Sequence, residues 1–292
     1  MKGMNPMKKV FALVLALMLL LSCAAFAEEA KPVILVVSFG TSYNDNRDLS
    51  IGAVEQAIQA AYPDWEVRRA FTAQTIIDIL DERDGIDIDN VTEAMDRLVA
   101  DGVKKVVIQP THVMNGYEYD DVVAEIAPYA DQFEGFAVGA PLLTSIEDYE
   151  AVTEALLADN EYVGSEDTAI VYMGHGTEHF ANATYSQMQL MMQAAGYENV
   201  FVGTVEGFPA LDNVMASVTA FGAEKVVLYP FMVVAGDHAN NDMAGDEEDS
   251  WKTAFTNAGF EVECVLEGMG QNPAIQAVYV EHVQAAMEEN GL

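Results

Sequence analysis

The chain has 292 residues, of which 51% are hydrophobic, and a formal net charge of −34 at pH 7 from 13 basic and 47 acidic side chains. This hydrophobic content argues against disorder, and the strongly acidic balance argues against binding to nucleic acids or anionic lipids. Most of the charge is expected to be a solvated coat that keeps the protein soluble, although it also attracts cations.

The first 27 residues have the pattern of a secretory signal peptide. Lys8 and Lys9 precede an apolar run from Val10 to Leu21, which leads to the small-x-small sequence Ala25-Phe26-Ala27. The run is shorter than the roughly 20 residues of a membrane helix, so no membrane span is expected. This segment holds three lysines and no acidic residue, and its removal leaves a net charge of −37. We therefore expect an exported, periplasmic or otherwise extracytoplasmic protein.

Cys23 offers an alternative processing site. Leu20-Leu21-Ser22-Cys23 faintly resembles a lipoprotein cleavage site, at which the cysteine would be lipidated and retained as an anchor. We favour simple cleavage because Ala25-Phe26-Ala27 fits the signal-peptide pattern well. Cys264 is then the only cysteine of the mature chain, so no intrachain disulfide can form.

In the first half of the mature chain, strand-like and helix-like segments alternate. The predicted strands are Val33–Ser38, Trp65–Arg69, Val103–Gln109 and Phe136–Val138. The predicted helices are Leu49–Tyr62, Thr75–Leu80, Val91–Ala100, Asp120–Tyr129 and Ile146–Ala158. This alternation predicts an α/β fold, in which a parallel sheet is flanked by helices.

The scheme starts again after the polar stretch Asp159–Asp167. The predicted strands are Ala169–Met173, Val200–Val205, Lys225–Tyr229 and Glu261–Leu266. The predicted helices are Ser186–Ala195, Ala210–Phe221, Asp249–Ala258 and Ala274–Glu289. The second half therefore predicts another parallel sheet flanked by helices.

The two halves form an internal repeat. The segment Lys105–Pro110, KVVIQP, returns 120 residues later as KVVLYP, and the register holds through Gly116 and Gly236. Val36–Thr41 likewise returns as Val171–Thr177 with one residue added. We therefore expect two similar lobes, 28–158 and 159–292, related by a pseudo-twofold axis. The carboxyl ends of both sheets would then line a shared cleft, where open α/β sheets bind ligands.

Candidate functional residues lie where the two halves differ. At the end of its first strand, the early lobe has Phe39 where the late lobe has His175, which stands between two glycines. In the loop after the strand that ends in proline, the early lobe has Glu118 and the late lobe has His238. These positions follow the carboxyl ends of strands, so we expect the late lobe to carry most of the metal ligands.

Other ionisable residues are weaker candidates. Glu206 ends a buried strand, where a carboxylate needs a partner or caps the next helix. His179 has His-x-x-x-His spacing from His175, but the Gly-rich turn favours a supporting or structural role. His112 aligns with a methionine and is expected to be a buried structural histidine, Cys264 is expected in the core, and His282 on the surface.

Two imidazoles with one or two carboxylates can bind Co²⁺, Ni²⁺, Fe²⁺ or Zn²⁺ without the thiolates of a closed structural site. Other chemistries find little support in the sequence. No Gly-x-Gly-x-x-Gly follows the first strand, and neither a phosphate-binding P-loop nor a Gly-x-Ser-x-Gly elbow occurs. The residues therefore indicate a metal site between two α/β lobes.

The ordered motifs along the chain resemble the class II chelatases, and most closely the anaerobic sirohydrochlorin cobaltochelatases of cobalamin biosynthesis. The matching segments are Val37–Ser42, Met173–Gly176, Val205–Gly207 and Gly236–His238. The resemblance implies a chelatase-like fold and insertion of a divalent metal, Co²⁺, into sirohydrochlorin. It implies that His175, Glu206 and His238 bind the metal, that the histidines also accept protons, and that Glu118 completes the opposite wall. No cofactor besides the substrate metal is implied.

Several alternatives stay open at this point. An extracytoplasmic carrier of metal, tetrapyrrole or haem would keep the fold without turnover, and iron or nickel could replace cobalt. The family allows exported homo-oligomers with haem between subunits, but no histidine here is a secure haem ligand. Sirohydrochlorin carries many carboxylates and needs a local basic patch, for which Arg68 and Arg69 are candidates beside a simple solvated strand end.

The predicted export makes a direct test available. The mature chain should begin at Glu28, because cleavage follows Ala25-Phe26-Ala27. Mass spectrometry of the N-terminus of the protein from its native cells measures this start. A chain that begins with a lipidated Cys23 would contradict this prediction and indicate a membrane-anchored protein.

Overall fold

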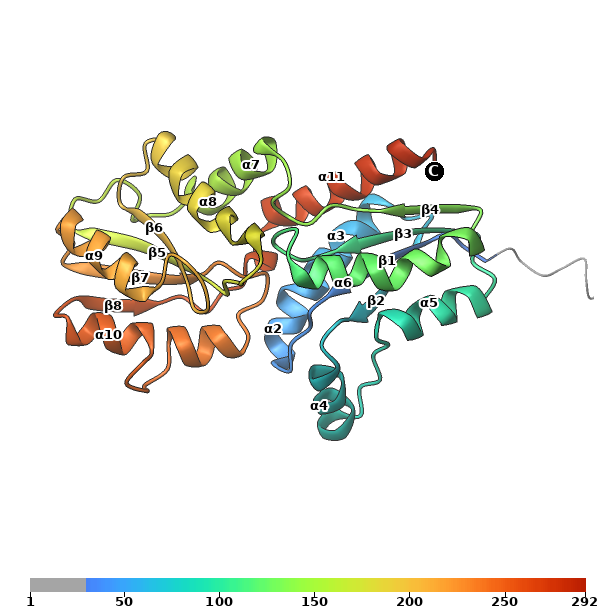
Figure 1. Ribbon diagram of the computed structural model, residues 1–292, viewed down its shortest axis with the longest axis horizontal. Helices are drawn as coiled ribbons and strands as arrows, with labels where there is room; N and C mark the ends of the chain where they lie inside the picture. The colour runs from blue at the N-terminus through green and yellow to red at the C-terminus, as the bar shows by residue number, and fades with distance from the viewer. Residues whose placement is uncertain (1–29) are drawn as a thin grey trace, which may run out of the picture.

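The computed structural model describes residues 30–292 (Figure 1). The predicted signal peptide, Cys23 and Glu28 lie outside the described residues. Within them, two four-stranded parallel sheets have the strand orders β2-β1-β3-β4 and β6-β5-β7-β8. The strands are β1 (Val33–Ser38), β2 (Glu66–Phe71), β3 (Lys105–Pro110), β4 (Gly135–Val138), β5 (Thr168–Gly174), β6 (Val200–Thr204), β7 (Lys225–Pro230) and β8 (Glu261–Cys264). The predicted two-lobed α/β architecture is confirmed.

Helices cover both faces of each sheet, and among the described residues four shorter helical turns lie between them. The α-helices are α2 (Asn44–Leu49), α3 (Ile51–Ala61), α4 (Gln74–Asp84), α5 (Val91–Ala100), α6 (Tyr117–Ile126), α7 (Ile146–Leu157), α8 (Ala183–Ala194), α9 (Leu211–Phe221), α10 (Trp251–Asn257) and α11 (Pro273–Asn290). The shorter turns are η1 (Ala127–Gln132), η2 (Phe180–Asn182), the π turn η3 (Ala239–Met243) and η4 (Met269–Gln271). None of the described helices is long and apolar enough to cross a membrane.

The strand pairing confirms the repeat and simplifies it. Val37 of β1 pairs with Pro110, and Met173 of β5 pairs with Pro230. Val37 and Met173 are therefore equivalent, which makes Phe39 the counterpart of His175 without the added residue that the sequence comparison required. The loops that follow also correspond: Asp120 N donates to Gly116 O at 3.0 Å, and Asn240 N donates to Gly236 O at 3.1 Å.

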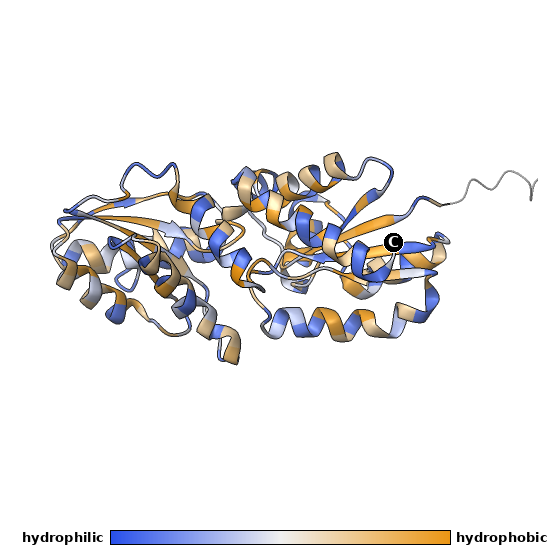
Figure 2. Cartoon of the chain, turned by 90° about the horizontal axis from the view of Figure 1, so that it is seen from above, coloured by the Kyte–Doolittle hydropathy of each residue, from blue (hydrophilic) through white to orange (hydrophobic). Residues whose placement is uncertain are grey.

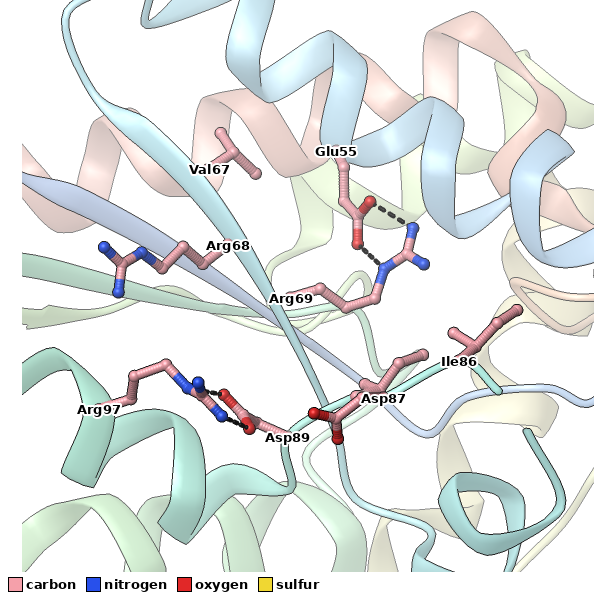
Figure 3. A pocket seen from close by; sticks show the side chains of 9 residues that line it. Glu55, Val67, Arg68, Arg69, Ile86, Asp87, Asp89 and Arg97 are labelled. Atoms are coloured by element: carbon pink, nitrogen blue, oxygen red, sulfur yellow. Dashed lines mark hydrogen bonds and ion pairs between the residues drawn. The ribbon is translucent and has the colours of Figure 1, made fainter. Parts of the chain in front are cut away.

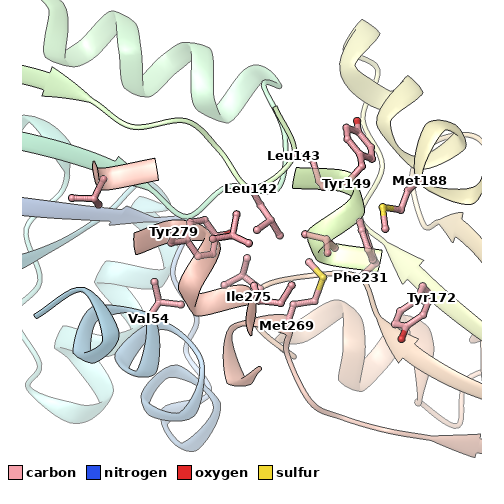
Figure 4. Close-up of a cluster of buried hydrophobic side chains, with 14 of the residues drawn as sticks. Val54, Leu142, Leu143, Tyr149, Tyr172, Met188, Phe231, Met269, Ile275 and Tyr279 are labelled. Atoms are coloured by element: carbon pink, nitrogen blue, oxygen red, sulfur yellow. The ribbon is translucent and has the colours of Figure 1, made fainter. Parts of the chain in front are cut away.

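One apolar core joins the two lobes. β-Branched side chains fill central strands whose residues are buried on both faces, as parallel sheets require, and Figure 2 shows the strands largely in the apolar colour. The largest cluster contains Ile34 and Val107 of the first sheet together with Ile170 of the second, and Tyr279 and Phe231 are fully buried within it (Figure 4). Each such side chain contributes about 1.5–3 kcal/mol by its burial.

The lobes exchange their last helices. Helix α7 comes from the first half, yet Tyr172 of β5 donates from its hydroxyl to Leu156 O in α7 at 3.1 Å. Helix α11 comes from the second half, yet it packs on α3, β3 and β4, and Tyr279 donates to Thr111 O at 2.8 Å (Figure 1). The division of the chain into two lobes at residue 158 stays a prediction. Helices from each half pack against the other half.

The prediction that His282 lies on the surface is wrong. Its side chain is buried, with Nδ1 3.0 Å from Ala140 O and Nε2 2.9 Å from Asp148 Oδ1. The reason is the helix exchange, because the buried residues of α11 recur at helical spacing on the stripe that faces the first lobe, and position 282 lies on it. The ring therefore lies between two acceptors, one on the backbone after β4 and one in α7.

Asp148 is the partner that makes this burial tolerable. Burial alone would raise the pKa of its carboxyl, but hydrogen bonds from the backbone N–H groups of Ser145 and Thr144 and from His282 outweigh it, so the pKa lies below its usual range. The same carboxylate closes the capping box at the start of α7. The pair therefore ties α11 to α7 where the lobes exchange helices.

Removing His282 should destabilise the protein. His282→Ala leaves the largely shielded carboxylate of Asp148 without its hydrogen-bond partner, and we expect a loss of about 1–3 kcal/mol in the free energy of unfolding. Urea unfolding measures it, with Gln284→Ala on the exposed side of α11 as the control, expected within about 0.5 kcal/mol of wild type. Equal stability of the two variants would contradict the proposed tie.

The pair also gives a pH dependence with a defined sign. Because the folded pKa of Asp148 is lowered, its contribution is fully present above the unfolded value of about 4 and is lost as the pH falls through the folded value. Asp148→Asn should therefore flatten the acid limb of the stability curve. An unchanged acid limb would mean that other carboxylates dominate it.

Candidate metal centre

The loops that follow the carboxyl ends of the strands in both lobes meet at the middle of the molecule (Figure 1). A Cβ added to Gly236, after β7, would lie 3.3 Å from Thr41 Oγ1, in the loop after β1. On the other side, His179, after β5, has its ring centroid 4.8 Å from that of Tyr117, after β3. The loops that were predicted to line the cleft therefore lie close to one another, and they come from both lobes.

His175 follows β5 directly and is held by its two glycine neighbours. Gly176 has φ +86°, and a Cβ there would lie 2.5 Å from Gly207 N, so only glycine lets the two loops come together. Gly176 N donates to the hydroxyl of buried Tyr185 at 3.2 Å. These contacts fix the backbone of His175 and leave 47% of its side chain exposed to the cleft.

Glu206 follows β6 and is tied to the same loop. Its backbone N–H donates to His175 O at 2.8 Å, and Gly207 N donates to Thr204 Oγ1 at 3.1 Å. Its Oε2 lies 4.0 Å from His175 Nε2. In the other lobe, Ala73 N donates to Phe39 O at 3.2 Å, so Ala73 is the counterpart of Glu206. The carboxylate is thus an addition of the second lobe, as the histidines are.

His238 stands on a loop that the first lobe anchors. Val234 packs into an apolar cluster of the first lobe, and Ala235 N donates to Asn46 Oδ1 at 2.9 Å. The chain then enters a helical turn that widens into the π turn η3, a rare geometry that is often found at functional sites. His238 therefore lies at the start of a short helix rather than in an open loop, and its Nδ1 lies 2.8 Å from Asp242 Oδ2.

The structure brings His175 and His238 together. Their ring centroids are 4.6 Å apart, with the ring planes at 85°. The Nδ1 atom of His175 lies 2.7 Å from Gly176 O, and that of His238 faces Asp242. A carbonyl oxygen and a carboxylate only accept, so each neutral ring carries its proton on Nδ1 and keeps the lone pair on Nε2. Both histidines are thus in the tautomer that binds a metal through Nε2.

The carboxylates lie farther out. Two donors that share a metal tetrahedrally at about 2.1 Å are roughly 3.4 Å apart, so Glu206 Oε2 needs a small side-chain rotation to join His175. Glu118 lies in the first turn of α6 rather than in a loop, and its Oε2 accepts a bond from Thr72 Oγ1 at 3.1 Å, within its own lobe. Among residues 30–292, no group of three His, Cys, Asp or Glu side chains is already arranged around a common ion position.

Three other predicted residues have structural surroundings. His112 is half-buried with both ring nitrogens shielded from solvent, and desolvation lowers its pKa to about 4, which keeps it neutral. Neither of its ring nitrogens has a hydrogen-bond partner among the described residues. His179 faces helix α6, as described below, and Cys264 is a half-buried free thiol at the end of β8.

The two arginines proposed as a basic patch are already neutralised. They line a cavity of about 440 Å³ beside β2, together with Arg97 (Figure 3). Arg69 makes two 2.6 Å hydrogen bonds to Glu55, and Arg68 contacts Glu66 and Asp101. The prediction that they end their strand is wrong, because β2 continues to Phe71. They therefore present no free positive charge at the cleft.

The two carboxylates nearest to His238 in sequence have different partners. Asp242 accepts from the ring of His238, whereas Asp237 accepts from Asn241 Nδ2 at 2.8 Å. Thr72, the partner of Glu118, carried no signal in the sequence, since a threonine after a strand is common. The contact between Tyr117 and His179 could not be predicted from the sequence either, because it joins residues of different lobes.

Comparison with known proteins agrees with this geometry. Residues 32–288 match the family of cobalt chelatases (CbiK). The chain belongs to this family. It is 42% identical over 257 residues, 88% of this chain and 97% of the relative, to a protein of Salmonella typhimurium named sirohydrochlorin cobaltochelatase. It is 30% identical over 259 residues, 88% of this chain and 91% of the relative, to a protein of Nitratidesulfovibrio vulgaris named sirohydrochlorin cobaltochelatase CbiKC.

Solved structures support the fold. One is titled SirB from Bacillus subtilis with Fe3+, and the match has a TM-score of 0.59 at 14% identity, with 90% of this chain and 98% of that chain covered. Another is titled as the structure of CbiX, with a TM-score of 0.53 at 15% identity and coverage of 88% and 99%. The predicted chelatase fold is therefore confirmed.

The hydrogen bond between Asp242 and His238 generates a prediction for this chelatase. Asp242→Asn should weaken Co²⁺ binding by about 10- to 100-fold, because the amide no longer secures the proton on Nδ1. Titration of the apo protein with Co²⁺, followed by visible absorption, measures it. Asp237→Asn removes the same charge from the same turn without touching the ring and should change the affinity less than about threefold. Equal losses in the two variants would mean that only local charge matters.

Proposed function

We propose that this chain inserts Co²⁺ into sirohydrochlorin, with His175 and His238 as the residues that hold the metal. The observation that carries the proposal is the pair of imidazoles at the cleft, 4.6 Å apart, each with its Nε2 lone pair free. The names of the relatives support the substrate, because the two relatives described above are named sirohydrochlorin cobaltochelatases. The metal is a substrate of this reaction and not a resident cofactor.

The chemistry asks for two tasks that these side chains can share. The ion must exchange its waters for protein ligands and then for the four nitrogens of the macrocycle, and two pyrrole protons must leave. Imidazoles that carry their proton on Nδ1 can bind the ion first through Nε2 and accept protons once the ion has moved on. Glu206 is the proposed third ligand, because its Oε2 lies 4.0 Å from His175 Nε2 and a short side-chain rotation would bring it closer.

Glu118 is proposed to act from the opposite wall. It occupies the position of the first lobe that corresponds to His238, and its carboxylate is oriented by Thr72. A carboxylate there can take up a pyrrole proton from the face of the macrocycle that is turned away from the metal. Phe39, the counterpart of His175, has 51% of its surface exposed and offers an apolar surface to a flat ring instead.

The choice of metal belongs to the proposal as well. Two imidazoles and a carboxylate accept Co²⁺, Ni²⁺ and Fe²⁺, and availability decides among them as much as affinity. Incubation of the purified mature protein with sirohydrochlorin and each metal, followed by the absorption spectrum of the macrocycle, tests the proposal. Tight binding of metal or macrocycle without metallation would instead identify a carrier with a chelatase fold.

We also propose that the reaction takes place outside the cytoplasm. The support is the signal-peptide pattern of the first 27 residues, which lie outside the described residues. The substrate would then have to reach the same compartment. No haem site and no oligomeric state is proposed for the described part of the chain.

Replacing either histidine gives the sharpest test of the site. His175→Ala and His238→Ala should each lower cobalt insertion by at least about 100-fold, because each removes a ligand and a proton acceptor. The melting temperature should stay within about 2 °C of wild type, since both side chains face the cleft and pack little. Unfolding of either variant, or insertion at the wild-type rate, would favour a structural role.

A further inference from the structure

His179 reaches across the cleft to the helix that carries Glu118. Its side chain is 8% exposed, and it comes from the loop between β5 and α8 of the second lobe. Its ring meets the edge of Tyr117 at 4.8 Å between centroids, and its Nε2 lies 3.6 Å from Asp120 Oδ2. Tyr117 and Asp120 flank Glu118 in the first turn of α6, and their i, i+3 spacing puts them on one face.

The orientation of this ring is fixed within its own lobe. His179 Nδ1 accepts a hydrogen bond from Ala181 N at 3.1 Å, and His179 N donates to Thr177 Oγ1 at 3.1 Å. Because Nδ1 accepts, the ring proton is on Nε2, which points towards the carboxylate of Asp120. Both ring nitrogens are thus engaged away from the metal pair, which leaves His179 no lone pair for the metal.

The two sides of the cleft are joined differently. On the side of α2, Asn46 accepts the backbone N–H of Ala235 and Val234 is inserted among apolar residues of the first lobe. On the side of α6, the contact of His179 is an aromatic edge and a charge–dipole contact that is longer than a hydrogen bond. The α6 side is therefore the weaker one, although it carries Glu118.

We propose that His179 is a positioning residue that sets the distance between Glu118 and the two metal-holding histidines. This inference rests on the proposed function. The path is short, since His179 is four residues from His175 and touches the residues on either side of Glu118 in α6. A displacement of about 1 Å can cost a reaction on the order of 100-fold when the acceptor must meet a proton held by a bound substrate.

The chain offers a variant that separates this role from a local structural one. His179→Asn keeps an oxygen that can accept the N–H of Ala181, as asparagine does at helix starts, but it is too short to reach Tyr117 and Asp120. We expect a melting temperature within about 2 °C of wild type, unchanged Co²⁺ affinity and about 10-fold lower kcat for cobalt insertion. His179→Gln, which is longer, should recover part of the loss.

A double-mutant cycle with Glu118→Gln tests whether His179 acts through Glu118. If it does, Glu118→Gln should lower kcat much less in the His179→Asn background than in wild type, because the carboxylate is already misplaced there. Additive losses would overturn the inference, since they would show that His179 acts independently of Glu118. Asp121→Asn is the control, because Asp121 follows Asp120 in α6 and is exposed. Its effect on kcat should add to that of His179→Asn.

A measurement without turnover keeps this inference distinct from the proposed function. Spin labels at Asp121→Cys on α6 and Leu190→Cys on α8, in the mature chain with Cys264→Ala, report the distance between the two sides by electron paramagnetic resonance. His179→Asn should broaden or lengthen the distance distribution relative to the labelled parent. An unchanged distribution overturns the positioning role, whereas an inactive wild type with a changed distribution overturns only the proposed function.

Discussion

The shared apolar core between the lobes is the constraint on which the candidate site depends. Two parallel sheets connected by a single chain segment could adopt many relative orientations, and most would leave the strand ends apart. Here, helices α7 and α11 each cross to the other lobe, and one cluster of buried side chains draws on both sheets. The carboxyl ends are therefore held face to face, with the loop of Glu118 on the side of the first lobe. His175 and His238 meet for a more local reason, because they follow β5 and β7, which are neighbours in the second sheet.

The repeat explains how such a site can arise without new architecture. The backbone hydrogen bonds after the first strands correspond in the two lobes, from Ala73 with Phe39 to Glu206 with His175. Only the side chains differ at these positions: apolar ones in the first lobe and polar ones in the second. Glu118 and His238 also occupy equivalent positions, but here the side chain is polar in both lobes. In the proposed site, one lobe thus supplies the metal ligands, and the other supplies an apolar surface and a single carboxylate.

The fold was largely predictable because its signals are local or repeated. Buried β-branched strands and the KVVIQP and KVVLYP segments identified two parallel sheets, and strand-end glycines marked the loops of His175 and His238. The burial of His282 escaped prediction although its helical stripe was visible, because a sequence does not say which lobe covers the stripe. Arg68 and Arg69 were misplaced because the strand boundary shifted by two residues, and their carboxylate partners come from α3 and from the end of α5. Contacts between distant elements were the common missing information.

The openness of the metal pair follows from the task proposed for it. A structural site with four ligands holds its ion too firmly to give it up, whereas a metal substrate must leave for the nitrogens of the macrocycle. The rings of His175 and His238 keep 47% and 33% of their side-chain surface exposed, and Glu206 stands 4.0 Å from its neighbour. The rings are instead held by the hydrogen bonds that their Nδ1 atoms donate, to Gly176 O from His175 and to Asp242 Oδ2 from His238. The protein therefore fixes the orientation of the two imidazole rings without enclosing an ion. In the proposed reaction, this openness leaves room for the macrocycle to reach the metal.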